Sequence, residues 1–287
     1  MKKLFVLALA VLMILALVSC DAVTPAKTGE TEKTAEPAKT AEPAKTAEPA
    51  ATGSEQQETE EQPTEPVGTL IMATNATFPP YEYYEGTEMV GIDVEIAKAI
   101  AAKLNMTLEI KDVPFDTIIA GIETGNFTIG VAGMTVTDER LETVNFSDPY
   151  ATGVQVVIVK EGSSIQSLDD LSGKKIGVQQ GTTGDIYASD DFGEDNVSKF
   201  KNGPDAVQAL VSGSVDAVII DNEPAKNYVA ANEGLTILET SYADEDYAIA
   251  IAKTNTDLLS KINTALEELT DDGTIPAIIE KYIPSGN

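Results

Sequence analysis

The stretch that decides the fold is Val131-Ala-Gly-Met-Thr-Val-Thr-Asp-Glu-Arg140, which ends in the only arginine of the 287 residues. The other 18 of the 19 basic residues are lysines, so the chain uses a guanidinium at one place alone. Its planar fork of donors matches a carboxylate, which it binds through two hydrogen bonds. The apolar run Ile129–Ala132 predicts a buried strand, and ligands of open α/β sheets bind beyond strand ends. The stretch therefore predicts a carboxylate site, with a surface arginine paired to Asp138 or Glu142 as the alternative.

The composition excludes several classes of function. The chain carries 47 acidic and 19 basic residues, a formal net charge of −28, so its surface charge will not bind nucleic acid or an anionic membrane. It contains no histidine and one cysteine, Cys20. Histidine acid–base catalysis, zinc sites, cysteine nucleophiles and structural disulfides within the folded part are therefore excluded. The length suits one large domain or two ordinary ones.

Residues 1–20 have the pattern of an export signal. Lys2 and Lys3 precede the apolar run Phe5–Val18, whose 14 residues are too few to span a membrane comfortably. The run ends in Leu17-Val-Ser-Cys20, which resembles the lipobox of bacterial lipoproteins. That resemblance implies a diacylated Cys20 and a lipid anchor on the extracytoplasmic face of the cell membrane. Such an anchor holds a protein at the membrane although no part of the chain crosses it. The alternative is an ordinary signal peptide with an incidental cysteine.

Residues 21–66 predict a disordered tether. The hexapeptide Thr34–Lys39 recurs as Thr40–Lys45 and nearly again as Thr46–Ala51. A proline in every sixth position blocks a continuous helix, and the segment has almost no apolar side chain with which to build a core. We expect it to hold a folded domain off the bilayer at variable distance.

Strand and helix patterns alternate from Val67 onward and predict an α/β fold. Asp93 is expected to cap a helix, and Asp116 a second helix that ends at Gly125. The final helices are expected at Thr256–Leu269 and Ile275–Tyr282. The predicted strands are Thr69–Asn75, Thr107–Lys111, Ile129–Ala132, Lys174–Gln179 and Val215–Ile220.

The order of these patterns repeats. Ile118–Val131 and Val207–Val218 both give a helix, a glycine stop and a buried strand. Two similar lobes, each with a central β-sheet flanked by helices, are the simplest explanation, and pockets are common at such interfaces. The apolar runs Val154–Val159 and Tyr247–Ala252 are the candidate crossings between the lobes. We expect residues 67–153 and 247–287 in the first lobe and residues 154–246 in the second.

Polar and aromatic residues after the predicted strands suggest a ligand. The turn Gly181–Gly184 can present backbone N–H groups to an anion. Asp221 follows a nearly continuous apolar strand, where a carboxylate needs a partner, or else caps the helix that begins near Pro224. Phe78 and Phe115 lie in loops and suit a flat wall around a side chain, although packing in the core is the alternative for each. Together with the predicted carboxylate site, an ammonium partner and aromatic walls describe a free α-amino acid.

The same regions carry a family resemblance, which covers Val67 to Ile283. It is carried by the motifs Ala76-Thr-Phe-Pro-Pro-Tyr-Glu-Tyr83, Gly91-Ile-Asp-Val-Glu95, Ala132-Gly-Met-Thr-Val-Thr-Asp-Glu-Arg140, Phe146-Ser-Asp-Pro-Tyr150, Gln180-Gly-Thr-Thr-Gly-Asp185 and Asp216-Ala-Val-Ile-Ile-Asp221. In this order the motifs resemble those of bacterial polar amino acid-binding proteins, the solute-binding subunits of ABC importers, in the glutamine/arginine/lysine branch. The resemblance implies the periplasmic-binding-protein-like type II fold, in which two lobes joined by two hinge strands close on the ligand.

The resemblance also implies roles for individual residues. The position of Arg140 holds the α-carboxylate together with Thr135, Gly133 and the Gly/Thr turn, and that of Asp221 holds the α-ammonium. Phe78 and Phe115 match positions that pack the side chain. The complete predicted ligand site is Asn75, Phe78, Phe115, Ala132, Gly133, Met134, Thr135, Arg140, Gln179, Thr182, Thr183 and Asp221, with no metal and no cofactor.

Two departures from the family pattern bear on the substrate. Asn75 stands where several members have aspartate, which favours glutamine, and Gln179 stands where the glutamine-specific type has lysine, which favours a cation such as arginine. We favour a basic amino acid, arginine first. The expected partners are a free L-amino acid and an ABC permease, the expected state is a monomer, and no enzyme activity is expected. The alternatives are an enzyme similar to cyclohexadienyl dehydratases, with Glu82 or Asp221 as general acid, and an amino acid sensor.

Overall fold

The computed structural model describes residues 65–239 and 241–285. The predicted signal segment 1–20, with Cys20, and residues 21–64 of the predicted tether lie outside the described residues. Within the described ranges, every helix is too short or too polar to cross a membrane.

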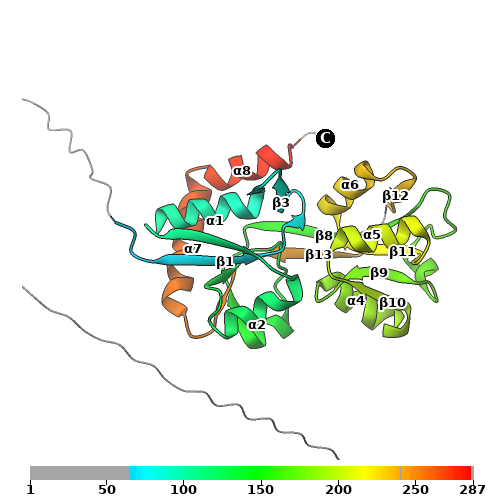
Figure 1. The fold of residues 1–287 in the computed structure, drawn as a ribbon, viewed down its shortest axis with the longest axis horizontal. Helices are drawn as coiled ribbons and strands as arrows, with labels where there is room; N and C mark the ends of the chain where they lie inside the picture. The colour runs from blue at the N-terminus through cyan, green and yellow to red at the C-terminus, as the bar shows by residue number, and fades with distance from the viewer. Residues whose placement is uncertain (1–64, 240, 286–287) are drawn as a thin grey trace, which may run out of the picture. The chain divides into compact units, whose positions relative to one another are not determined.

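The first lobe is built on a five-stranded sheet (Figure 1). Its strands follow the order β5-β1-β6-β14-β7; β1 pairs in parallel with β5 and β6, whereas β14 pairs antiparallel with β6 and β7. The parallel strands therefore direct their carboxyl ends to one edge of the sheet. The strands are β1 (Thr69–Thr74), β5 (Thr107–Asp112), β6 (Ile129–Gly130), β7 (Val144–Phe146) and β14 (Ala250–Ala252).

Helices and a small sheet complete the first lobe. Helix α1 buries Ile96 and Ile100, four residues apart on one face, in a core that it shares with α7 and α8. The small antiparallel sheet β2-β3-β4 follows β1 directly. These elements are β2 (Thr77–Phe78), β3 (Glu82–Glu85), β4 (Glu88–Val90), α1 (Ile92–Lys103), the 3₁₀ helix η1 (Phe115–Thr117), α2 (Ile118–Glu123), α3 (Asp138–Thr143), α7 (Thr256–Asp271) and α8 (Thr274–Tyr282).

The second lobe contains a six-stranded sheet of order β10-β9-β11-β8-β12, with β13 paired to β8. β9 is parallel to β10 and β11, so this lobe also has an edge formed by carboxyl ends. Its strands are β8 (Ala151–Lys160), β9 (Ile176–Gln179), β10 (Val197–Phe200), β11 (Ala217–Asp221), β12 (Leu235–Ile237) and β13 (Ala243–Tyr247). Its helices are η2 (Leu168–Leu171), α4 (Thr183–Phe192), η3 (Glu194–Asn196), α5 (Gly203–Ser212) and α6 (Asn222–Ala231).

Two antiparallel segments connect the lobes. β13 pairs with β8, and the pairing continues where the Tyr150 N–H donates to the Tyr247 carbonyl oxygen at 2.9 Å (Figure 1). The predicted fold class, with two α/β lobes joined by two hinge strands, is confirmed. The candidate crossing Val154–Val159 lies within β8, and Tyr247–Ala252 covers the end of β13 and all of β14. The exact limits of the lobes, at 153/154 and 246/247, stay a prediction.

Two predicted helix caps are wrong. Asp93 is the second residue of α1, whose N-cap is Gly91 without a side-chain hydrogen bond. The Asp93 carboxylate instead accepts hydrogen bonds from the Gly133 N–H at 2.7 Å and the Tyr150 hydroxyl at 2.8 Å. Asp116 lies inside η1 and accepts a hydrogen bond from the Gln180 side chain at 3.0 Å. Both carboxylates serve contacts between distant segments, which local sequence does not reveal.

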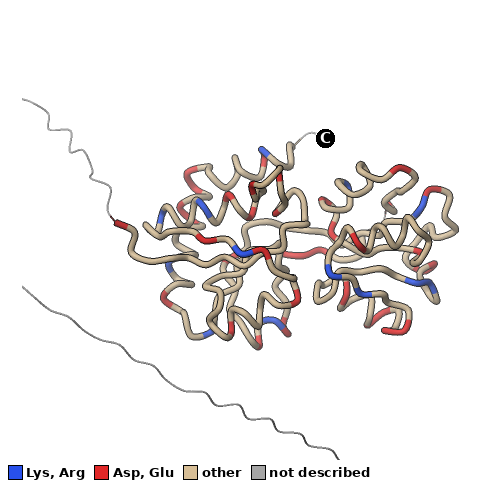
Figure 2. Tube along the Cα trace, viewed as in Figure 1, with Lys and Arg blue, Asp and Glu red and all other residues tan. Residues whose placement is uncertain are grey.

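The charge of the folded part is spread over both lobes (Figure 2). From Val67 to the end, the sequence has 36 acidic and 13 basic residues, a net charge of −23. A field of this sign attracts cations and repels anions, and it acts over about 10 Å at moderate salt.

Candidate ligand-binding site

A narrow cavity, with a free volume of about 10 Å³, lies between the carboxyl edges of the two sheets. Of the predicted site residues, the cavity takes in all but Met134, and it adds Glu82. Its lining is Asn75, Phe78, Glu82, Phe115, Ala132, Gly133, Thr135, Arg140, Gln179, Thr182, Thr183 and Asp221.

Strand ends explain why these residues meet. Asn75 directly follows β1, and Gly133 lies three residues after β6. In the second lobe, Gln179 ends β9 and Asp221 ends β11. Because ligands of α/β sheets bind outside the carboxyl ends of the strands, the topology places the site where two such edges face each other.

Arg140 is buried in the first turn of α3, with 6% of its surface exposed. Its guanidinium donates to the Thr135 carbonyl oxygen at 2.6 Å and to the Gly181 carbonyl oxygen, in the other lobe, at 3.0 Å. The Phe115 ring lies 5.4 Å from the guanidinium carbon. Burial lowers the pKa of Arg140, an effect opposed by the charges of Glu245 and Asp221. The guanidinium therefore remains a cation.

Among the described residues, Arg140 forms no ion pair with a carboxylate. The alternative of a surface arginine paired with Asp138 or Glu142 is therefore wrong. The two backbone carbonyl oxygens fix the orientation of the fork without neutralising its charge. A buried, oriented and unpaired cation suits the carboxylate of a ligand.

The Gly/Thr turn is held by a buried carboxylate. Thr182 is the N-cap of α4, and its hydroxyl oxygen accepts from the Asp185 N–H. Asp185 in turn accepts from the Gly181 N–H at 2.9 Å and pairs with Lys199 at 2.9 Å. The first N–H groups of a helix have no partner within the helix and carry partial positive charge. The turn thus adds a second element that favours an anion near Arg140.

Several hydrogen bonds show that the two lobes are closed on each other. The Gln179 side chain donates to the Asn75 side-chain oxygen at 3.0 Å, and the Tyr228 hydroxyl donates to the Thr77 carbonyl oxygen at 2.5 Å. Both bonds join the second lobe to the first. Asn75 also donates to the Val113 carbonyl oxygen at 3.0 Å, so its side-chain orientation is fixed.

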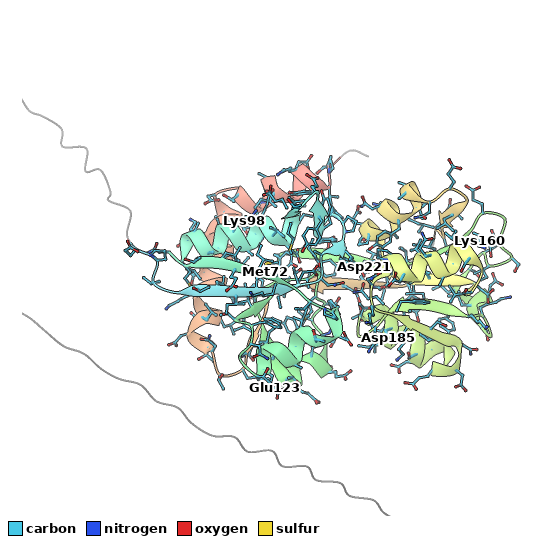
Figure 3. All side chains as sticks on the ribbon, viewed as in Figure 1. Met72, Lys98, Glu123, Lys160, Asp185 and Asp221 are labelled. Carbon is cyan, nitrogen blue, oxygen red and sulfur yellow. The ribbon has the colours of Figure 1, made fainter. Side chains whose placement is uncertain are left out.

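Asp221 lies at the junction of the lobes (Figure 3). It is the N-cap residue of α6, but its side chain forms no capping hydrogen bond. The Tyr247 hydroxyl donates to its carboxylate. Burial, and next the charge of Glu245, raise the pKa of Asp221 to about 8. Asp221 forms no ion pair with any of the described residues, so its carboxyl group favours a cation in the cavity.

Glu82 was left out of the predicted site, although it lines the cavity and is only 1% exposed. Burial, and next the charge of Asp93, raise the pKa of Glu82 well above its usual range. Burial likewise raises the pKa of Asp93 to about 6. From the sequence, Glu82 is a candidate only as the general acid of the enzyme alternative.

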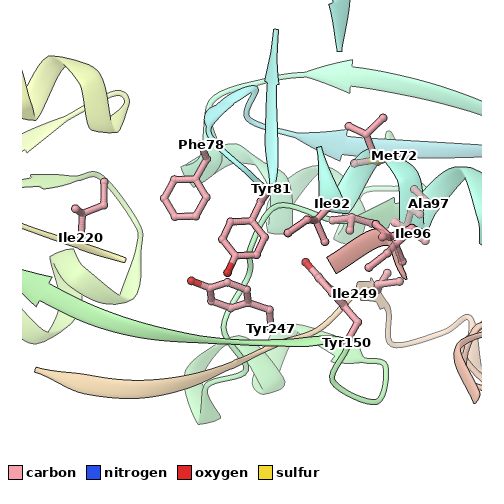
Figure 4. Packing of buried hydrophobic residues seen from close by; sticks show 14 of the residues in the cluster. Met72, Phe78, Tyr81, Ile92, Ile96, Ala97, Tyr150, Ile220, Tyr247 and Ile249 are labelled. Atoms are coloured by element: carbon pink, nitrogen blue, oxygen red, sulfur yellow. The ribbon is translucent and has the colours of Figure 1, made fainter. Parts of the chain in front are cut away.

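Two aromatic rings of the first lobe lie beside the cavity. Phe78 and Phe115 both line the cavity, and Phe78 packs on Tyr81, which contacts Tyr247 edge to face (Figure 4). Met134 differs, because its fully buried side chain belongs to a core cluster rather than to the cavity. Its carbonyl oxygen accepts from the Ala248 N–H at 3.1 Å. This bond joins the segment after β6, which carries site residues, to the segment between β13 and β14.

Several known proteins are similar to this chain in sequence and in fold. Residues 70–285 match the family of bacterial extracellular solute-binding proteins, family 3. The chain is 36% identical over 219 residues to the arginine-binding extracellular protein ArtP of Bacillus subtilis, a match that covers 74% of this chain and 85% of ArtP. Structures of an ancestral arginine-binding protein, bound to glutamine and bound to arginine, are 45% identical to it with TM-scores of 0.72 and 0.71. Each of these matches covers 75% of this chain and 98% of the ancestral protein. The chain therefore belongs to the bacterial extracellular solute-binding proteins, family 3.

Proposed function

We propose that this protein captures a basic L-amino acid, arginine first, between its two lobes. One observation carries the proposal: a buried guanidinium and a buried carboxyl group, those of Arg140 and Asp221, line the same cavity. They are complementary to the carboxylate and the ammonium of a free α-amino acid. In this arrangement Arg140 and the Gly/Thr turn bind the α-carboxylate, and Asp221 binds the α-ammonium.

Glu82 favours a cationic side chain. It contributes a buried carboxyl group beside the aromatic residues, whereas Asn75 and Gln179 are neutral and repel no cation. An aromatic ring contributes about 0.5–2 kcal/mol to the binding of a guanidinium that lies over its face. The net charge of −23 from Val67 onward favours encounters with cations. The matches to proteins named for arginine support the same choice, while the ancestral protein bound to glutamine keeps glutamine as the competing ligand.

A ligand panel tests this proposal. The protein is first freed of bound ligand by unfolding and refolding, and calorimetry then compares arginine, lysine, histidine, glutamine and cystine. We expect arginine to bind at least about tenfold more tightly than glutamine, a difference of about 1.4 kcal/mol. Binding of glutamine at least tenfold more tightly than arginine would show that the pocket selects a neutral side chain.

We also propose that the protein is the binding subunit of an ABC importer, that it acts as a monomer and that it has no catalytic activity. Its family and its lobes closed around a small cavity support transport. An enzyme that acts on a prephenate-like acid would use Glu82 or Asp221 as a general acid. Incubation of the purified protein with prephenate and with arogenate tests this alternative, since product formation would contradict a pure binding role.

Replacement of Cys20 with serine tests the proposed lipid anchor. Cys20 follows the apolar run Phe5–Val18 and is the only thiol of the chain. Without that thiol no diacyl group can be attached, so the C20S variant should appear in the medium or remain unprocessed. Fractionation and palmitate labelling provide the measurement. A variant that stays membrane-bound and still takes up palmitate would exclude Cys20 as the anchor.

A further inference from the structure

A tyrosine outside the cavity joins the two lobes. Tyr228 lies in α6 of the second lobe and stands apart from the described residues that line the cavity. Its hydroxyl donates to the carbonyl oxygen of Thr77, in β2 of the first lobe, at 2.5 Å. Only 7% of the surface of Tyr228 is exposed. Because a buried hydroxyl group without a partner costs free energy, this bond favours the arrangement in which the two lobes meet.

The segment that accepts this bond carries part of the cavity wall. The Thr77 hydroxyl donates to the side-chain oxygen of Asn75 at 3.0 Å. The next residue, Phe78, is opposite Glu82 in the pairing of β2 with β3. Asn75, Phe78 and Glu82 all line the cavity. A contact that fixes Thr77 therefore also fixes three residues of the wall.

Helix α6 connects the same contact to the proposed ammonium site. Asp221 is the N-cap of α6, and Tyr228 follows it by seven residues, which is about two turns. A helix moves as a rigid unit when one lobe rotates against the other. A rotation that brings Asp221 to the ligand therefore also brings Tyr228 to Thr77.

The second lobe leaves room for the Tyr228 side chain. Gly203 begins α5, and a Cβ atom there would lie 2.9 Å from the Tyr228 hydroxyl oxygen and 3.0 Å from a ring carbon. Burial, and next the charges of Glu82 and Asp221, raise the pKa of Tyr228. The hydroxyl therefore keeps its proton at neutral pH and remains a donor to Thr77.

We propose that Tyr228 is a positioning residue that holds the lobes together around the bound ligand and so sets how long the ligand stays. The inference rests on the proposed capture of an amino acid. A ligand enters and leaves while the lobes are apart, whereas the bond from Tyr228 to Thr77 forms when they meet. The bond therefore slows release and leaves entry unchanged. Because Tyr228 lies outside the cavity, it acts alike on every amino acid that the lobes enclose.

Release kinetics of the Tyr228→Phe variant test the inference, because phenylalanine keeps the ring and removes only the hydroxyl. Release of radiolabelled amino acid into an excess of unlabelled ligand gives the dissociation rate, and calorimetry gives the affinity. We expect dissociation about tenfold faster than in the wild type, which corresponds to about 1.4 kcal/mol, with the association rate unchanged. The same factor should apply to arginine, lysine and glutamine.

Tyr242→Phe is the matched control. The Tyr242 hydroxyl donates to the Asp191 carboxylate and, at 3.3 Å, to the Tyr187 carbonyl oxygen. Both acceptors lie in α4, so these bonds stay within the second lobe. This variant loses a tyrosine hydroxyl of comparable kind and should release the ligand at the wild-type rate, even where its unfolding temperature is lower.

Three results would overturn the inference, provided that circular dichroism shows a folded Tyr228→Phe protein. The first is a dissociation rate equal to that of the wild type. The second is a loss of affinity that lies in the association rate. The third is a factor that differs among the three amino acids, since that would make Tyr228 part of side-chain selection. A ligand panel in which the wild type binds no amino acid would instead contradict the proposed function.

Discussion

Replacement of Arg140 with methionine should weaken amino acid binding at least about 100-fold while the protein still folds. Arg140 is the only arginine of the chain, and it lies buried on the cavity wall without a carboxylate partner among residues 65–239 and 241–285. A hydrogen bond to a charged group contributes about 1.5–3 kcal/mol, so the loss of a bidentate pair lowers the affinity at least about 100-fold. Methionine keeps an apolar stem beside the Phe115 ring, which limits damage to packing.

The measurement is calorimetric affinity for the tightest amino acid of the panel, with circular dichroism and thermal unfolding to verify the fold. Arg140→Lys is the matched control, because it keeps the charge and loses the planar fork. It should bind more tightly than Arg140→Met and more weakly than the wild type. An Arg140→Met protein with wild-type affinity would exclude Arg140 as the carboxylate-binding residue.

The fold could be predicted because its determinants are local. Helix, glycine stop and buried strand occur twice, at Ile118–Val131 and Val207–Val218, and each pattern depends on neighbouring residues alone. The same pattern predicted that Asp221 ends a buried strand, as it does in β11.

Helix caps were less predictable. Asp93 and Asp116 have the residue type of a cap, but tertiary contacts use their carboxylates instead.

Most of the candidate site could be predicted because it follows strand ends. The charges that act on its carboxyl groups could not, because they belong to residues that are distant in the chain. Asp93 acts on Glu82 through the packing of β3 on α1, and Glu245 acts on Asp221 through the strands that pair with β8. One signal for Glu245 was present. It shares a strand face with Tyr247, whereas Asp244 and Asp246 alternate to the exposed face.

Replacement of Asp221 with asparagine should have opposite effects on binding and on stability. Asparagine has almost the same shape and still accepts the Tyr247 hydroxyl, but it cannot balance an ammonium. Loss of this charge should weaken binding about 100-fold for every amino acid of the panel, since each presents the same ammonium. The matched control is Glu223→Gln, in the first turn of α6, where the side chain is partly exposed and pairs with Lys226. It should bind like the wild type.

Stability distinguishes the proposed role from that of a helix cap. The pKa of Asp221 is raised from 3.8 to about 8 in the folded protein, so its contribution is complete in acid and is lost as the pH rises through that interval. Asparagine resembles the protonated form at every pH. The ligand-free Asp221→Asn protein should therefore match the wild type near pH 4 and unfold at a higher temperature above pH 8. A capping residue would give no such gain, because asparagine caps a helix about as well as aspartate. Thermal unfolding of both proteins from pH 4 to 9 decides between them, and a variant no more stable than the wild type above pH 8 would return Asp221 to a structural role.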